Sequence, residues 1–119
     1  MNLAPIVLFV YNRPWHTRKT VESLQSNELA QDSDLIIYSD NSKKPKNQQQ
    51  VDKVRQYIKT IKGFKKITII ERDRNWGLAD SIIDGVTKTV NEFGRVIVME
   101  DDLVTSSYFL RYLNDVYFL

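Results

Sequence analysis

The chain has 119 residues, a net charge of +2, 42% hydrophobic and 27% charged residues, which suits one soluble globular domain with a modest core. So small a net charge gives little attraction for nucleic acid or membranes. The absence of cysteine excludes disulfides, thiolate metal sites and cysteine nucleophiles. No apolar run reaches the roughly 20 residues of a membrane-spanning helix, and the first residues lack signal-peptide features. We therefore expect one cytoplasmic domain over residues 1–119, with no membrane span and no nucleic-acid partner.

In chain order, the first element is a continuous apolar run at residues 4–11, which predicts a strand covered on both faces. Asn12 and Pro14 follow, and these residue types cap and open helices. The expected buried stripe of this helix is Thr17, Val21 and Leu24. Residues 35–39, LIIYS, predict the second strand.

A polar loop then leads into a second helix, which Gly63 is well placed to end. The expected stripe of this helix is Val51, Val54, Ile58 and Ile61. Residues 67–70, ITII, predict the third strand, and the loop ERDRNWG leads to a third helix. The buried stripe of the third helix should include Leu78, Ile82, Val86, Val90 and Phe93.

The fourth strand, residues 95–99, leads into three adjacent acids. Ser106 or Ser107 can start a last helix, with Phe109, Leu113 and Val116 on one face. Four alternating strand–helix units favour an α/β fold, a Rossmann-like three-layer sandwich with a mostly parallel sheet flanked by helices. Right-handed crossovers leave few topologies, and we expect strand order 3-2-1-4.

Polar residues follow three of these strands at the same edge of the predicted sheet. Arg13 follows the first strand, Asp40 the second, and Glu100, Asp101 and Asp102 the fourth. Ligands of open α/β sheets bind at the carboxyl ends of the strands, near the point where the strand order reverses. We therefore expect these side chains to converge on one cleft.

Three adjacent carboxylates repel one another, so a compensating charge is expected near them. Magnesium or manganese would supply it, since such cations take one or two carboxylates together with water and phosphate oxygens. Arg13 can donate charge-assisted hydrogen bonds to a phosphate, and Asp40 can accept one from a base or a ribose. The sequence contains no glycine-rich phosphate loop, so metal and arginine would have to neutralise the phosphates.

At this point the residues resemble a known family. IVMEDDLVTSSYFLRYL resembles the metal motif and following helix of GT-A fold glycosyltransferases of the N-acetylglucosaminyltransferase I type. PIVLFVYNRPWHTRKTVESL is similar to the family's opening strand, arginine turn and first helix, and NWGLADSIIDGV resembles the N-x-G segment of family 2 transferases. The resemblance implies metal-dependent transfer of a sugar from a nucleotide-diphosphate sugar, in particular a UDP-sugar, to an acceptor that the sequence does not identify.

The resemblance also implies roles for the acidic motif and its neighbours. Asp102 would be the direct metal ligand, while Glu100 and Asp101 would hold the ribose and the sugar of the donor. Asp40 matches the acid that recognises the uracil ring, and Arg13 matches the arginine near the diphosphate. The motif is EDD where the commoner form is D-x-D.

In the N-x-G segment, Asn75 and Gly77 match the family's positions, whereas Asp84 stands where family 2 members more often have asparagine. The resemblance implies that a second half, with the acceptor site and the catalytic carboxylate, follows the metal motif. We therefore expect these 119 residues to be a truncated GT-A fold that supplies the donor-binding half. The fourth strand would then lie at an open sheet edge, which invites self-association.

Other interpretations remain open. The three acids can cap the last helix in water, residues 40–42 can be simple turn chemistry, and Trp15 and Trp76 can be packing residues. Two other functions are a non-catalytic nucleotide-binding or interaction module and a receiver-like magnesium-binding signalling domain. In receiver domains, however, the acidic pair follows the first strand, whereas here the acids follow the fourth.

Overall fold

The computed structural model describes residues 3–103 and 105–116 of the chain. Strands and helices alternate along it, as predicted. The strands are β1 (Ile6–Val10), β2 (Asp34–Ser39), β3 (Lys66–Glu71) and β4 (Ile97–Glu100). The α-helices are α1 (Pro14–Gln25), α2 (Gln48–Ile58), α3 (Leu78–Phe93) and α4 (Phe109–Val116), and two short 3-10 helices are η1 (Ala30–Asp32) and η2 (Pro45–Asn47).

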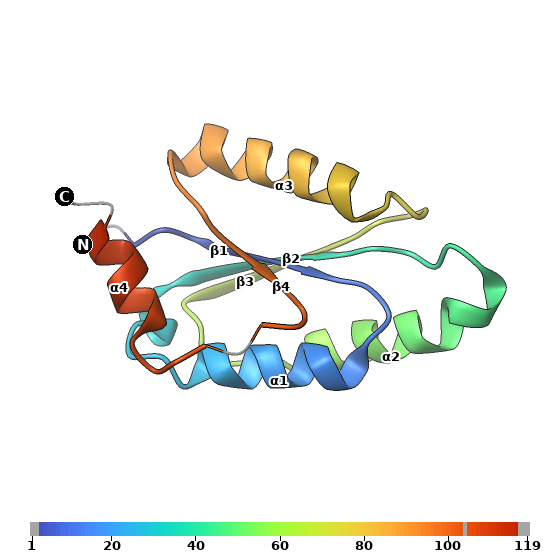
Figure 1. Ribbon diagram of the computed structural model, residues 1–119, viewed down its shortest axis with the longest axis horizontal. Coiled ribbons are helices and arrows are strands. Elements are labelled where there is room, and N and C mark those ends of the chain that lie inside the picture. Colours follow the sequence, from blue (N-terminus) through green and yellow to red (C-terminus); the bar gives the residue numbers. More distant parts are fainter. Residues whose placement is uncertain (1–2, 104, 117–119) are drawn as a thin grey trace.

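The four strands form one sheet of order β3-β2-β1-β4, and every neighbouring pair is parallel. In Figure 1, α3 lies over one face of the sheet, and α1 and α2 lie over the other. The predicted α/β sandwich and strand order are therefore confirmed. The order reverses between β1 and β4, so the carboxyl ends of these two strands flank the expected cleft.

The residues of β1 alternate between two apolar clusters, because successive side chains of a strand point to opposite faces. Val7 and Phe9 join Tyr38 on the face that α3 covers, with Ile82 and Val86 packed against them. The opposite face holds the larger cluster, which includes Ile6, Leu8, Val10, Val21, Leu24, Leu35, Ile37, Val54, Ile58 and Leu110. All five β1 residues are buried, which explains why that segment is apolar throughout.

The ends of α1 and α2 differ in detail from the sequence expectations. Pro14 opens α1 as predicted, but Arg13, not Asn12, is the residue that precedes the helix. Helix α2 ends at Ile58, not near Gly63. Ile61 is buried as expected, yet it lies in a turn beyond the helix, where its N–H donates to the carbonyl of Ile58.

The predicted buried stripe of α3 is confirmed for Ile82 and Val86, which pack against the core and are partly buried, and is wrong for the other three residues. The residues that α3 buries are Ser81, Gly85 and Thr89, whereas Leu78, Val90 and Phe93 are exposed. The reason is the pair of large rings on the facing side of the sheet. A Cβ atom on Gly85 would lie 2.8 Å from the Tyr38 ring and 2.9 Å from the Phe9 ring. The helix therefore approaches the sheet along its small residues.

Helix α4 packs beside η1 at the end of the sheet where β1 begins, on the side of the sheet opposite α3 (Figure 1). Its Leu110 is fully buried, and the backbone N–H of Leu110 donates to Asn27 Oδ1 at 2.9 Å. Phe109 and Leu113 are partly buried against the core, as predicted for the apolar face. The side chain of Val116, the third residue predicted for that face, lies outside the described residues.

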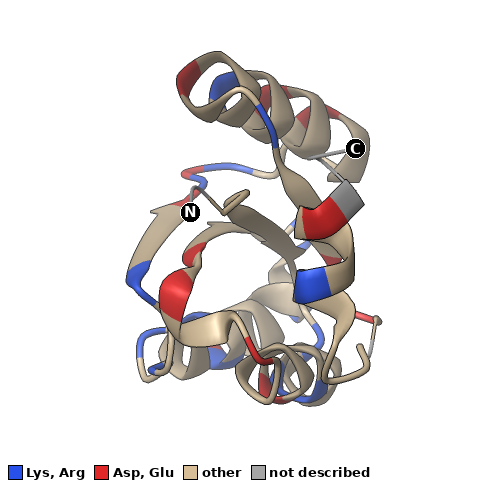
Figure 2. Ribbon diagram, turned by 90° about the vertical axis from the view of Figure 1, so that its left-hand side faces the viewer, with Lys and Arg blue, Asp and Glu red and all other residues tan. Residues whose placement is uncertain are grey.

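Charged residues of both signs are interspersed on the two helical layers (Figure 2), in keeping with the small net charge. None of the helices in the described part of the chain has both the length and the apolar character needed to cross a membrane.

Candidate functional site

A cavity of about 380 Å³ opens at the carboxyl ends of the strands, between the sheet and the start of α3. All six residues that the sequence analysis singled out line this cavity: Arg13, Asp40, Asn75, Glu100, Asp101 and Asp102. The rest of the lining consists of Phe9, Val10, Tyr11, Asn12, Tyr38, Lys43, Gly77, Leu78 and Ser81. The structure thus brings the candidate residues together, and their individual roles stay predictions.

Arg13 and Asp101 form the central ion pair of the cavity. Arg13 Nη2 lies 2.8 Å from Asp101 Oδ1 and 4.0 Å from Asp102 Oδ2. The Asp101 side chain is almost completely buried, with 9% of its surface exposed. Burial raises the pKa of the Asp101 carboxyl, and the positive charge and hydrogen bond of Arg13 offset part of this rise. Arg13 therefore has two possible partners, the buried acid and an incoming anion.

The acids on either side of Asp101 are more accessible. Glu100 is the last residue of β4 and pairs in register with Phe9 of β1. Asp102 follows the strand, and 48% of its side chain is exposed. The interpretation of these acids as caps of the last helix is not favoured, because α4 begins only at Phe109.

Three histidine or acidic side chains placed to hold a cation by themselves do not occur within residues 3–103 and 105–116. Magnesium does not need such a cage, because it is usually bound through one or two carboxylates together with substrate phosphates. An exposed Asp102 beside Arg13 fits that arrangement. The oxygen atoms of these acids are therefore suited to bind a divalent cation that arrives with a phosphorylated ligand.

Asp40 is buried at the end of β2, and its carboxylate accepts hydrogen bonds from four donors. Oδ1 accepts from the backbone N–H groups of Asn41 and Trp76, both at 2.9 Å. Oδ2 accepts from the Gly77 N–H at 3.0 Å and from Asn75 Nδ2 at 3.3 Å. The Asp40 carboxylate therefore holds the loop that starts α3.

Asn75 and Gly77 complete this connection between the loops after β2 and β3. Asn75 Nδ2 also donates to the carbonyl oxygen of Asn41 at 2.8 Å. Gly77 precedes α3 with φ at +80°, a backbone conformation that residues other than glycine rarely adopt. Both residues of the N-x-G segment thus have a local structural reason for their identity.

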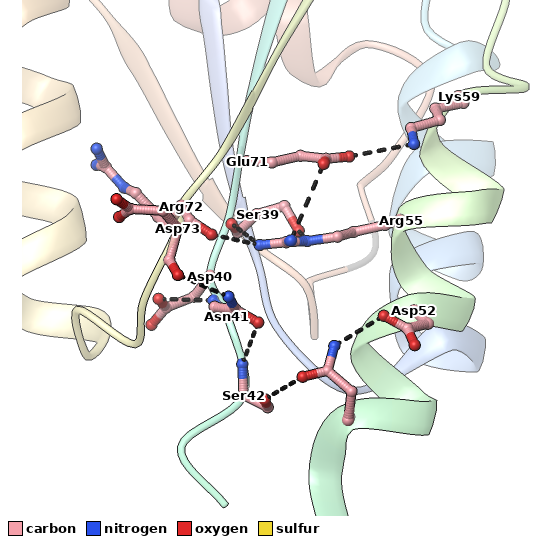
Figure 3. Close-up of polar contacts among 11 residues, drawn as sticks. Ser39, Asp40, Asn41, Ser42, Asp52, Arg55, Lys59, Glu71, Arg72 and Asp73 are labelled. Carbon is pink, nitrogen blue, oxygen red and sulfur yellow. Dashed lines mark hydrogen bonds and ion pairs between the residues drawn. The ribbon is translucent and has the colours of Figure 1, made fainter. Parts of the chain in front are cut away.

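Two arginines near the carboxyl ends of β2 and β3 were missed by the sequence analysis. Arg55, from α2, donates to the carbonyl oxygens of Ser39 and Arg72 at 3.1 and 2.8 Å and so ties the ends of β2 and β3 to the helix (Figure 3). The guanidinium carbon of Arg72 lies 4.6 Å from the Tyr38 ring centre and 4.0 Å from that of Trp76. Neither an arginine on a helix, such as Arg55, nor an arginine in a polar loop, such as Arg72, carries a sequence signal for these contacts.

Asp84 is the counter-ion of Arg72, at 2.9 Å. Partial burial raises the pKa of Asp84, but Lys88 and Arg72 outweigh it through hydrogen bonds and charge, so the pKa lies below its usual value. The aspartate that stands where family 2 members more often have asparagine therefore balances a buried positive charge in this chain.

Tyr11 and Lys43 are two further lining residues that the sequence analysis did not select. The Tyr11 hydroxyl accepts from the backbone N–H of Lys43 at 3.0 Å and from Asn47 Nδ2 at 3.3 Å. Lys43 belongs to a lysine-rich loop, and such loops usually serve only solvation. In the structure this loop is attached to the rim of the cavity, which adds a second positive charge there.

The comparisons with known proteins agree with this geometry. The family model of glycosyl transferase family 2 matches residues 6–115. The crystal structure of S. aureus TarS superposes with a TM-score of 0.62 at 13% sequence identity, over 92% of this chain and 18% of that one. At that identity the likeness shows the fold alone. No curated protein matches the chain. With nearly its whole length inside the family model and with the strand order described above, the chain belongs to glycosyl transferase family 2 and has the GT-A type of fold.

Proposed function

We propose that this chain supplies the donor-binding part of a metal-dependent glycosyltransferase that uses a nucleotide-diphosphate sugar, in particular a UDP-sugar. The observation that carries the proposal is the cavity at the carboxyl ends of β1, β2 and β4, whose lining includes Arg13, the three acids and the aromatic residues Phe9 and Tyr38. Family membership supports a nucleotide-sugar donor. The uridine base belongs to the proposal, which names neither the sugar nor the acceptor.

In this proposal, Asp102 ligates magnesium or manganese, Glu100 and Asp101 bind the ribose and sugar hydroxyls, and Arg13 binds the diphosphate. When bound, the cation would stabilise the negative charge that develops on the departing diphosphate. The Arg13–Asp101 pair keeps the guanidinium at the cavity. Asp40 and Asn75 serve the nucleotide by fixing the loop over the cavity.

A second candidate function is nucleotide binding without sugar transfer. The cavity lined by Arg13 and the acids supports it as well as it supports transfer. The chain spans 18% of the TarS chain that it resembles. The receiver-like interpretation has no such support, because the acids follow β4 and the family match points elsewhere. We also propose a cytoplasmic location, with which the absence of cysteine agrees. Fractionation of cells that express the tagged chain tests it.

Titration calorimetry with UDP, with and without manganese, tests the proposed function. Asp102→Asn removes the charge of the proposed metal ligand, and Asp32→Asn is the matched control, since Asp32 is also exposed but lies on η1. We expect manganese-dependent binding that weakens at least about tenfold in Asp102→Asn, because hard cations prefer charged oxygen ligands. Asp32→Asn should bind like the unmodified protein.

A folded protein that binds UDP under neither condition would contradict the proposal. Binding that is equally tight without manganese would show that nucleotide binding does not need the proposed metal ion. Release of free sugar from a UDP-sugar by the wild-type chain, lost in Asp102→Asn, separates an active transferase domain from a binding module.

A further inference from the structure

Ser81 of α3 has a buried hydroxyl that the fold itself does not use. The residue is 3% exposed, and Ser81 Oγ has no hydrogen-bond partner among the described residues. A buried hydroxyl without a partner destabilises a protein, so its presence requires an explanation. Ser81 also lines the cavity described above.

Thr89 is the natural comparison, because it belongs to the same buried stripe of α3 and is also 3% exposed. Thr89 Oγ1 donates to the carbonyl oxygen of Gly85, four residues earlier, at 2.8 Å, which is the usual way for a helical hydroxyl to be satisfied. Thr89 does not contribute to the cavity lining. The unsatisfied member of the stripe is therefore the one that meets the cavity.

The part of the cavity beside Ser81 is apolar and aromatic. Its neighbours in the lining include Leu78, Phe9 and Tyr38, and the two rings are stacked with centres 5.4 Å apart. Arg13 comes from the loop after β1, and the three acids come from the end of β4 and the loop that follows it. The part of the lining beside Ser81 thus offers apolar and aromatic atoms together with one free hydroxyl.

A phosphate is a poor fit beside Ser81, although helix N-termini often bind anions. The N–H groups of Trp76 and Gly77 already donate to the carboxylate of Asp40, and Asp80 adds a second negative charge in the first turn of α3. An anionic group would be repelled by these two acids. The site favours an uncharged, flat ligand group that has hydrogen-bonding atoms on its edge.

We propose that the Ser81 hydroxyl hydrogen-bonds the nucleobase of the bound nucleotide and that Phe9, Tyr38 and Leu78 form the surface around that base. This inference rests on the proposed function and extends it to a residue that determines base preference. A hydroxyl both donates and accepts, so it can pair with a carbonyl oxygen or a ring N–H of a uracil-type base. The phosphates then extend toward Arg13 and the acids.

Calorimetry with two probes, UDP and inorganic pyrophosphate, each with magnesium, tests the assignment. Ser81→Ala should weaken UDP binding roughly three- to tenfold, the range for one neutral hydrogen bond, and leave pyrophosphate binding unchanged. Ser81→Cys nearly keeps the size of the side chain but forms weak hydrogen bonds, so its UDP affinity should lie between those of wild type and Ser81→Ala. Thr89→Val removes a satisfied hydroxyl from the same stripe and should leave UDP affinity unchanged.

Thermal unfolding without ligand adds a readout that does not depend on binding. Ser81→Ala should keep or raise the Tm because it removes an unpaired polar group, whereas Thr89→Val should lower it. UDP affinity that is equal in wild type and Ser81→Ala would overturn the inference and leave the proposed function standing. An equal loss for both probes would overturn the base assignment. A folded wild type that binds no UDP would overturn the proposed function and this inference together.

Discussion

At the scale of single residues, the distribution of hydrogen bonds separates the groups that build the cavity from those left free to meet a ligand. Asp40 has four donors on its carboxylate, whereas Asp102 has its nearest described basic atom at 4.0 Å. Both are acids that line the cavity and follow a strand, yet their surroundings suit them to different roles. Asp40 is suited to position the loop of residues 75–77, and Asp102 is suited to bind a cation.

Replacement of Asp40 by asparagine tests this division. The amide keeps the shape but has one oxygen acceptor, and its NH₂ group would face N–H donors of the loop. We expect the free energy of unfolding to fall by about 2–3 kcal/mol, in the range for hydrogen bonds to a charged group, and UDP binding to weaken as well. Urea denaturation of the ligand-free protein measures the first effect.

The control for Asp40→Asn is Asp73→Asn, because Asp73 is exposed and contributes its backbone carbonyl, not its carboxylate, to the bond with Asn41. It should change stability little. An Asp40→Asn protein that is as stable as wild type without ligand but weak in UDP binding would show that Asp40 contacts the base directly. That result would favour the role implied by the sequence motif over the positioning role.

At the scale of elements, the buried face of α3 shows what sequence periodicity leaves out. Periodicity places the bulky apolar residues inside, but the distance between helix and sheet depends on the residues opposite. Phe9 and Tyr38 occupy the space over β1 and β2, so α3 approaches with Ser81, Gly85 and Thr89. Small residues have no hydrophobic signal, and the rings that select them lie far away in the sequence.

The strands and the cleft, in contrast, could be predicted because their signals are local. Continuous apolar runs marked β1 and β2, and the carboxyl-end rule placed Arg13 and the acids of residues 100–102 together. The partners of Asp40 could not be predicted, since backbone N–H groups become available only through the turn at Gly77. The burial of Arg72 between two rings depends on the same turn.

Gly85→Ala tests the close approach of α3. Alanine is the better helix former by about 1 kcal/mol, so an isolated helix would gain stability. In the protein the added Cβ would lie 2.8 Å from the Tyr38 ring, and relief of that contact requires a shift of the helix or of the core. We expect a net loss of about 1–3 kcal/mol in the free energy of unfolding, measured by urea denaturation.

Asn91→Ala is the matched control, since Asn91 is an exposed residue of the same helix and alanine should be neutral or slightly stabilising there. A Gly85→Ala protein as stable as Asn91→Ala would mean that α3 can lie farther from the sheet at no cost. The rings would then not be the reason for the small-residue stripe.

At the scale of the whole molecule, the strand order leaves β4 at one edge of the sheet. The Ile97 N–H donates to the carbonyl of Pro5, so the backbone groups of its neighbour Val98 point away from β1. Val98 is 40% exposed and Leu103 is 44% exposed near the same edge. Within residues 3–103 and 105–116, no strand pairs with the outer side of β4, and an unpaired, partly apolar edge strand is a template for pairing with another chain.

Self-association through β4 therefore stays a prediction, and sedimentation velocity over a range of protein concentrations measures it. We expect wild type to form a larger species as concentration rises, and Val98→Lys to shift that transition to at least about tenfold higher concentration, because lysine on an edge strand opposes pairing. Ile83→Lys is the control: Ile83 is 65% exposed but lies on α3. If Ile83→Lys disperses the larger species and Val98→Lys does not, the exposed face of α3 mediates association. A wild-type chain that remains monomeric at every concentration would show that four strand residues are too short an edge to hold a second copy.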